Sequence, residues 1–342
     1  MTLAAWLHTL SPFAVRFTEN FGIRWYGLAY IAGFFVAYLI LQRLAARGKI
    51  LVPAPFVPDA MMWLIGGALV GGRVGYVLVY EQSAIWTFTS SPPWWEVLAI
   101  NHGGMASHGG MVGIIIGCWR VSRGWKTETG EVVGRCPMLH VMDAAALVAP
   151  FGIFFGRIAN FINGELLGRI VTPPGVEGPW WSVQFPQELT DGHAPPLTEA
   201  QAAQVITLAR QYMKPGEEHV TRQSLERLIS HASEHAAALK PLLASRQPSQ
   251  ILQALGEGGV VAVVLWILWA RKRAPGVIAA AFLFTYGVMR IVTEFSRLPD
   301  AKFVHQRFAG LSRGQWLSVG MIIAAGVVFY LAGRARKPAA RE

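Results

Sequence analysis

Long apolar runs alternate with polar stretches along this chain of 342 residues. A helix that crosses a bilayer needs about 20 mostly apolar residues. On this basis we predict seven spanning helices, at residues 24–42, 60–80, 102–120, 138–157, 251–270, 276–295 and 315–333. The third departs most from the pattern, because its first half reads HGGMASHGGM. The predicted fold class is an all-α, polytopic integral membrane protein, and its topology depends on the third segment.

The polar stretch at residues 190–245 lacks long apolar runs. Thr198 followed by Gln201 predicts a capping box that opens a helix, and a second helix is predicted from Val220 to Leu239. We interpret this stretch as an external helical arm. The alternative is a solvent-exposed insertion with no role in catalysis, because charged helical faces usually face solvent. The arm separates residues 1–189, with four predicted spans, from residues 246–342, with three.

Lysine and arginine cluster after the first, third, fifth and seventh predicted spans. The positive-inside rule assigns such clusters to the cytoplasmic side. With seven spans, the N-terminus is therefore outside and the C-terminus is cytoplasmic. Residues 81–104 contain no Lys or Arg, as expected of an external loop, whereas the basic loop after the sixth span disagrees. The clusters are Arg43, Arg47 and Lys49; Arg120, Arg123, Lys126 and Arg135; Arg271, Lys272 and Arg273; and Arg334, Arg336, Lys337 and Arg341.

Composition supports the membrane class. Hydrophobic residues make up 53% of the chain and charged residues 15%, with a mean hydropathy of +0.38, which is too apolar for an ordinary soluble protein. The net charge of +10 does not form the aromatic-interleaved basic stripe of a nucleic-acid surface, so no nucleic-acid partner is expected. Cys118 and Cys136 flank a predicted cytoplasmic loop, where thiols stay reduced.

Six ionisable residues fall within or at the ends of predicted spans: Arg73, Asp143, Arg157, Glu257, Arg290 and Glu294. Each such group costs about 2.5 to 3.5 kcal/mol on insertion scales, so each is a functional candidate. Three positive charges match three negative ones, as a packed network of ion pairs requires. One interpretation is that these residues only hold the helices together.

The predicted topology favours a functional role, because all of these charges except Asp143 fall in the outer half of the bilayer. Three further polar residues share that depth: Tyr26, His108 and Tyr286. A four-residue spacing lines up Tyr286, Arg290 and Glu294 on one helix face. Arginine binds phosphate in a bidentate manner. Arg157, three residues before Asn160, and Arg290 therefore predict a site for a lipid phosphate.

His102 and His108 raise the question of a metal site. Their separation places them about 240° apart on a helix, and no Cys or carboxylate completes a ligand set. We therefore expect no metal and no other cofactor. His108 lies between two glycine pairs, which suggests a base or hydrogen-bond donor where the backbone approaches a substrate. A histidine that packs helices is the alternative.

The segment Gly156–Arg169, GRIANFINGELLGR, resembles the signature of the bacterial prolipoprotein diacylglyceryl transferases. The resemblance covers the whole chain except the arm. Five further motifs follow in the family's order: RWYGLAY at 24–30, GGRVGY at 71–76, GGMASHGG at 103–110, RQPSQ at 246–250 and YGVMRIVTEFSRLPDA at 286–301.

This resemblance implies transfer of the diacylglyceryl group of phosphatidylglycerol to the lipobox cysteine of a preprolipoprotein. The expected location is the bacterial inner membrane, with the active site toward the outer leaflet. The implied catalytic residues are His108 as candidate base, with Arg157 and Arg290 on the phosphate. The implied lipid-binding residues are Tyr26, Arg73, Arg157, Asn160, Glu165, Gly168, Tyr286, Arg290 and Glu294.

The chain departs from the family pattern at Ala159, where glycine is usual, at His102 and Gln253, where an acid is usual, and in a longer arm. Glu257, one turn after Gln253, is a candidate replacement for the missing carboxylate. Two rival functions stay open, and the first of them uses the same arginines as a binding site. One is an anion transporter, although no paired internal repeats support it. The other is a catalytically inactive relative that only binds lipid or lipoprotein.

Overall fold

The computed structural model describes residues 4–18, 21–90, 92–99, 103–192, 194–298 and 310–334. Within these ranges, six helical stretches are long and apolar enough to cross a membrane: Trp25–Ala46, Ala54–Tyr80, Met138–Asn163, Ser249–Trp269, Val277–Glu294 and Gly314–Arg334. They coincide with six of the seven predicted segments. The protein is therefore mostly helical, with the helices of a polytopic membrane protein.

The third predicted segment overlaps helix α3, Ser107–Ser122, which has only 16 residues. At 1.5 Å per residue it is about 24 Å long, shorter than the bilayer core of about 30 Å. His102 lies outside the described residues. The seventh span and the orientation of the termini therefore stay predictions.

The chain forms two compact units, each built from separate stretches of sequence. The first unit contains residues 1–34, 150–263 and 284–323, and the second contains residues 35–149, 264–283 and 324–342. Helices α1 (Trp25–Ala46), α4 (Met138–Asn163), α10 (Val277–Glu294) and α11 (Arg313–Arg334) each supply residues to both.

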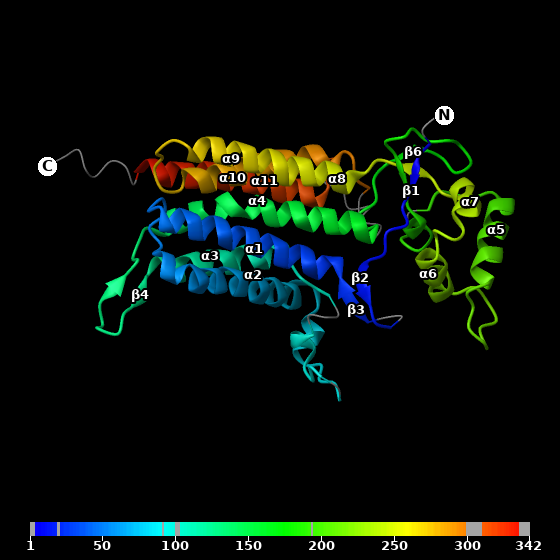
Figure 1. Ribbon diagram of the computed structural model, residues 1–342, viewed down its shortest axis with the longest axis horizontal. Coiled ribbons are helices and arrows are strands. Elements are labelled where there is room, and N and C mark those ends of the chain that lie inside the picture. Colours follow the sequence, from blue (N-terminus) through cyan, green and yellow to red (C-terminus); the bar gives the residue numbers. More distant parts are fainter. Residues whose placement is uncertain are drawn as a thin grey trace. The chain divides into compact units, whose positions relative to one another are not determined.

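In the second unit, α2 (Val57–Tyr80) and α3 pack side by side (Figure 1). Glycines make this close contact possible. A Cβ atom on Gly113 would lie 1.8 Å from the carbonyl oxygen of Gly67, and one on Gly109 would lie 2.2 Å from that of Gly71. The sequence suggests that the glycines beside His108 admit a substrate, but Gly109 instead admits helix α2, as small residues do between membrane helices.

Asp143 has a structural role in the second unit. Its two carboxylate oxygens accept hydrogen bonds from the amides of Gly276 and Ala279, each at 2.8 Å. Gly276 directly precedes α10 and Ala279 lies in its first turn, where N–H groups lack partners within the helix. Asp143 therefore caps α10 from α4, which fits its predicted separation from the other intramembrane charges.

The first unit contains a small sheet that the all-α prediction missed. Its strand order is β1 (Trp6–Leu7), β7 (Val183–Gln184), β8 (Ser245–Arg246) and β6 (Ile170–Thr172). β1 pairs in parallel with β7, and the other pairs are antiparallel. Strands of two or three residues are too short to give an alternating sequence pattern. Two hairpins, β2–β3 (Phe13–Arg16, Gly22–Arg24) and β4–β5 (Trp125–Lys126, Val132–Val133), complete the strands of the described residues.

The polar stretch at 190–245 forms helices α5 (Glu199–Arg210), α6 (Arg222–Ser230) and α7 (Ala236–Leu239) (Figure 1). The predicted capping box of Thr198 and Gln201 is confirmed. The prediction of one helix from Val220 to Leu239 is wrong, because the chain breaks between α6 and α7. Ala209, Leu228, Ala232, Leu239 and Leu243 of the arm form one buried apolar core together with Leu7 of β1. Its location outside the membrane stays a prediction.

Candidate functional site

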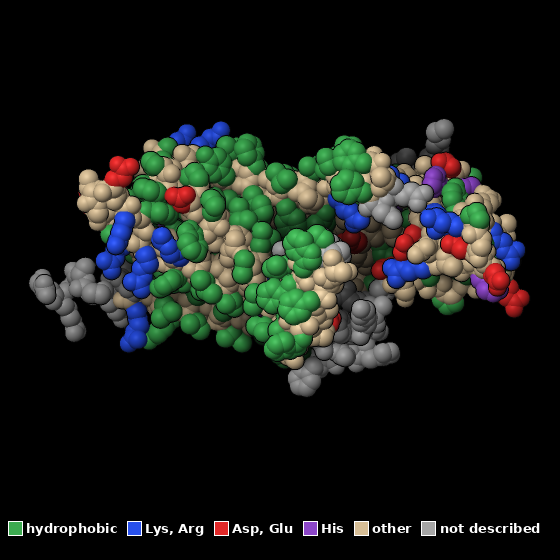
Figure 2. Space-filling model, turned by 90° about the horizontal axis from the view of Figure 1, so that it is seen from below, with side chains coloured by type: hydrophobic (Ala, Val, Ile, Leu, Met, Phe, Trp, Pro, Cys, Tyr) green, Lys and Arg blue, Asp and Glu red, His purple; other side chains and the backbone are tan. Residues whose placement is uncertain are grey.

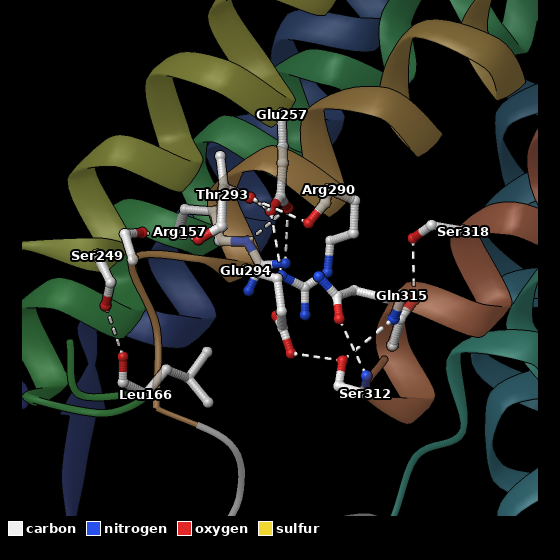
Figure 3. A network of polar contacts seen from close by, with 12 residues as sticks. Arg157, Leu166, Ser249, Glu257, Arg290, Thr293, Glu294, Ser312, Gln315 and Ser318 are labelled. Carbon is white, nitrogen blue, oxygen red and sulfur yellow. Dashed lines mark hydrogen bonds and ion pairs between the residues drawn. The ribbon is translucent and has the colours of Figure 1, made fainter. Parts of the chain in front are cut away.

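The first unit buries a network of two arginines and two glutamates (Figure 3). Glu257 is central, and its side chain is fully buried. One of its oxygens accepts hydrogen bonds from Nε and Nη2 of Arg157, at 3.1 and 2.7 Å. The other accepts from Thr293 Oγ1 at 2.7 Å and from Arg290 Nη1 at 3.4 Å. A single carboxylate therefore orients both guanidiniums.

Glu294 is the second acidic residue of the network. Its Oε2 lies 2.9 Å from Arg290 Nη1, and its Oε1 accepts a hydrogen bond from Ser312 Oγ at 3.0 Å. Gln315 fixes Ser312 in turn, because its Oε1 accepts from the Ser312 amide at 2.9 Å. The Arg157 side chain is 16% exposed and that of Arg290 is 13% exposed, whereas that of Glu257 is 0% exposed. The arginines, and not Glu257, can therefore meet a ligand.

A π-helical segment, Ala254–Val260, carries Glu257 between α8 (Ser249–Gln253) and α9 (Val261–Trp269). It lies close to α4, since a Cβ atom on Gly258 would be 2.7 Å from Cβ of Phe154. π-helices are rare and frequently occur at functional sites. Here the segment brings Glu257 beside Arg157 of α4.

The RQPSQ motif holds the loop that follows α4. Four of its groups donate to carbonyls of that loop: Gln250 Nε2 to Glu165, Ser249 Oγ to Leu166, Arg246 Nη1 to Gly168 and the Gln247 amide to Arg169. Figure 3 includes the contact of Ser249 with Leu166. The motif therefore fixes the backbone of the second half of the GRIANFINGELLGR segment.

Gly168 is required by this contact. A Cβ atom there would lie 2.0 Å from the backbone oxygen of Gln247, a distance that no side chain can tolerate. Arg246 is also fully buried and pairs with Glu188, Nε to Oε2, at 2.6 Å. The other oxygen of Glu188 accepts from the Ala244 amide at 2.8 Å. This buried pair anchors the strand that leads from the arm into the motif.

The other predicted residues of the first unit come from α1, α4, the loop after α4 and α10. Asn160 is buried in α4, whereas Glu165 is exposed on the following loop. Tyr26 lies in the first turn of α1, and its hydroxyl accepts a hydrogen bond from Tyr30 at 3.4 Å. Tyr286 lies on α10, one turn before Arg290. Tyr286, Arg290 and Glu294 therefore lie on one helix at the predicted four-residue spacing.

Arg73 and His108 belong to the second unit. Arg73 is buried, and its guanidinium donates to the backbone carbonyls of Glu96, Val97, Gly103 and Gly104. These four bonds use most of its five N–H groups, so they favour a structural role over the predicted lipid contact. The His108 ring lies 5.9 Å from the ring of Tyr80.

Sequence reasoning did not select several residues of the network. Glu257 was recognisable as an intramembrane charge, but nothing in the sequence marks it as the partner of both arginines. Thr293 lies three residues after Arg290 on α10, a spacing that could have indicated a shared face. Ser312 lies 18 residues after Glu294 in the sequence, and Gln315 lies three residues further on, so no local pattern relates them to it.

The fold and the site together define the class of this molecule. It is a polytopic helical membrane protein in which a buried glutamate holds two partly exposed arginines beside a motif-bound loop. The family model described as prolipoprotein diacylglyceryl transferase matches residues 12–331. The chain belongs to this family.

Three relatives, each named phosphatidylglycerol–prolipoprotein diacylglyceryl transferase, illustrate the similarity. The protein of Bdellovibrio bacteriovorus is 39% identical over 96% of this chain and 94% of its own. That of Xanthomonas euvesicatoria is 32% identical with the same coverage. That of Rhodospirillum rubrum is 36% identical over 92% of this chain and 90% of its own.

Proposed function

We propose that this protein transfers the diacylglyceryl group of phosphatidylglycerol to the thiol of the lipobox cysteine of a preprolipoprotein, the first step of lipoprotein maturation. The protein is a transferase of the membrane. The sulfur attacks the glycerol carbon that carries the phosphate, forming a C–S bond as the C–O bond breaks. Glycerol phosphate leaves with the electron pair, and the thiol proton passes to a base.

One observation carries the proposal: a buried carboxylate holds two partly exposed guanidiniums together. The phosphate gains one negative charge as the C–O bond breaks. Groups that are oriented before the reaction stabilise such developing charge more effectively than groups that must reorganise. Arg157 and Arg290 therefore serve as the phosphate clamp, and the Glu257 carboxylate keeps them in place before the lipid arrives.

The remaining site residues have supporting roles. His108 is the proposed base for the thiol, whose ordinary pKa of about 8.5 leaves little thiolate at neutral pH. The lipid contacts are Tyr26, Asn160, Glu165, Gly168, Tyr286 and Glu294. Arg73 acts through the loop that it binds, because its donors are engaged by carbonyls.

The topology that fits this reaction has seven spans, with α3 as the third. The N-terminus is outside and the C-terminus is cytoplasmic in the inner membrane. The site opens to the outer leaflet, and residues 190–245 form an external arm between the membrane segments at 1–189 and 246–342. The basic clusters after alternate spans support this orientation.

The test uses purified protein with phosphatidylglycerol and a lipobox peptide. Wild type should add one diacylglyceryl mass to the peptide and release glycerol phosphate. Arg290→Gln should lose at least about 100-fold in rate, since oriented charges at a developing anion contribute on that scale. Arg222→Gln is the matched control, because Arg222 is 75% exposed on the arm. Wild-type protein that makes neither product would contradict the proposal.

A further inference from the structure

The segment between α2 and α3 forms a hairpin, here called the aromatic hairpin, of residues 82–90 and 92–99. Phe88 and Trp95 form an antiparallel bridge and stack with ring centroids 6.2 Å apart. The Thr89 amide donates to the Trp94 carbonyl at 2.8 Å, and the Glu96 amide donates to that of Thr87 at 3.0 Å. These cross-chain bonds give the segment a defined conformation.

Arg73 fixes the base of the aromatic hairpin to α2. Its Nε donates to the Val97 carbonyl at 2.8 Å, and its Nη2 donates to that of Glu96. The indole of Trp95 also points inward, because its Nε1 donates to the Ile85 carbonyl at 3.0 Å. The hairpin is therefore held as a unit against the end of a predicted span.

The outer side of the aromatic hairpin exposes large apolar groups. Trp86 is 81% exposed, Phe88 70%, Trp94 62% and Leu98 57%. In Figure 2 this segment faces the viewer, and hydrophobic side chains gather on it. The patch continues onto the last turn of α2, where Val79 and Tyr80 are 58% and 52% exposed. Large clusters of this kind mark an interaction site rather than an ordinary soluble surface.

The inner side is polar. A cavity of about 300 Å³ lies there, and its polar lining residues include Arg73, Glu81, Ser83, Thr87 and Glu96. Residues 81–104 contain no Lys or Arg. A rigid element with aromatic groups on one side and polar groups on the other is suited to the boundary between lipid and water.

We propose that the aromatic hairpin inserts Trp86, Phe88 and Trp94 into the phospholipid interface of the leaflet at the end of α2, as a lipid-docking surface outside the arginine site. Phospholipid is the occupant because the patch is continuous with the apolar surface of a membrane helix. Trp and Tyr are enriched at this depth of the bilayer, where aromatic rings contact both acyl chains and headgroups.

The experiment measures the depth of a fluorescent label in vesicles. Cys118 and Cys136, the only two cysteines, are replaced by alanine, and an environment-sensitive dye is attached to Phe88→Cys. Glu218→Cys is the matched control, because Glu218 is exposed between α5 and α6 of the arm. The label at 88 should be quenched by lipids that carry a quencher near the headgroup and protected from aqueous iodide. The label at 218 should show the reverse.

Equal quenching of both labels by iodide would overturn the proposal. Protection at 88 that appears only after a lipobox peptide is added would also overturn it, since the hairpin would then bind peptide. Trp86→Cys provides a second label position if Phe88→Cys disturbs the stack with Trp95. The measurement needs no turnover, so its failure is distinguishable from a failure of the proposed function.

Discussion

Glu257 shows how much a single buried residue can decide. The two arginines would repel each other without it, and its carboxylate gives each guanidinium a fixed orientation. The carboxylate expected by family resemblance at position 253 is absent, and Glu257 sits one turn further on. The π-helical segment accounts for its reach toward both α4 and α10.

We predict that Glu257→Gln lowers kcat/KM by about 100-fold, equivalent to about 2.7 kcal/mol, because Arg157 loses the carboxylate that orients it and Arg290 keeps only Glu294. The KM for lipid should rise, and Glu257→Asp should restore part of the activity. Initial rates across lipid concentrations measure this. Glu226→Gln is the control, since Glu226 pairs with Arg222 on the surface. If Glu257→Gln left KM unchanged and only reduced the amount of folded protein, Glu257 would be a purely structural residue.

Gln253 provides a prediction on stability. Its side chain is fully buried, and neither its amide nitrogen nor its oxygen has a hydrogen-bond partner among the described residues. An unpaired buried polar group costs about 1 to 3 kcal/mol. Gln253→Met should therefore raise the free energy of unfolding by about 1 kcal/mol.

The neighbouring Gln250 is the matched comparison for that measurement. Gln250→Met should lower stability, because it leaves the carbonyl of Glu165 without its donor. Thermal unfolding of both variants in one detergent tests the pair. A lower melting temperature for Gln253→Met would show that the amide has an unrecognised partner.

At the scale of elements, the contact of α2 with α3 depends on glycines. The sequence shows where the glycines are, but it does not predict what they contact. A glycine-rich helix and a substrate-binding turn have the same composition. The structure decides between them, since backbone atoms of the two helices meet at Gly67 and Gly113. Likewise, RQPSQ is recognisable as a motif, but its contacts with the loop at 165–169 need the folded chain.

Gly113→Ala should lower the free energy of unfolding by about 1 to 3 kcal/mol, because the added methyl group meets the rigid backbone of α2. Gly66→Ala, on the neighbouring helix α2, is the control, since its Cβ would meet nothing within 4 Å. That variant should be neutral or gain up to about 1 kcal/mol from helix propensity. Equal melting temperatures for the two variants would contradict the close packing.

At the scale of the whole molecule, each unit is assembled from distant stretches of chain. His8 illustrates this in the first unit. Its Nε2 donates to the Phe161 carbonyl at 2.8 Å, and its Nδ1 lies 3.3 Å from Gln187 Nε2. The ring also lies 5.1 Å from that of Phe185. Burial lowers the pKa of His8 below its ordinary value of 6.5, so folding favours the neutral form of the ring.

This shift predicts a pH dependence of stability. A lowered pKa in the folded state means that the unfolded chain binds the proton more readily. The stabilisation is therefore complete above the unfolded pKa of about 6.5 and decreases as pH falls below it. The melting temperature of wild type should drop more between about pH 7.5 and about pH 5.5 than that of His8→Asn. Parallel curves for the two proteins would exclude His8 as the cause.

The sequence by itself determined the membrane class, six of the spans, the capping box of the arm and the motifs of the family, because these depend on local composition and spacing. It also placed Tyr286, Arg290 and Glu294 on one helical face. Only the tertiary structure decided that Glu257 joins Arg157 to Arg290, that Asp143 caps α10, and that Arg73 binds carbonyls of the aromatic hairpin. Those pairings join residues far apart in the chain, and long-range contacts between helices leave no periodic signal in one sequence.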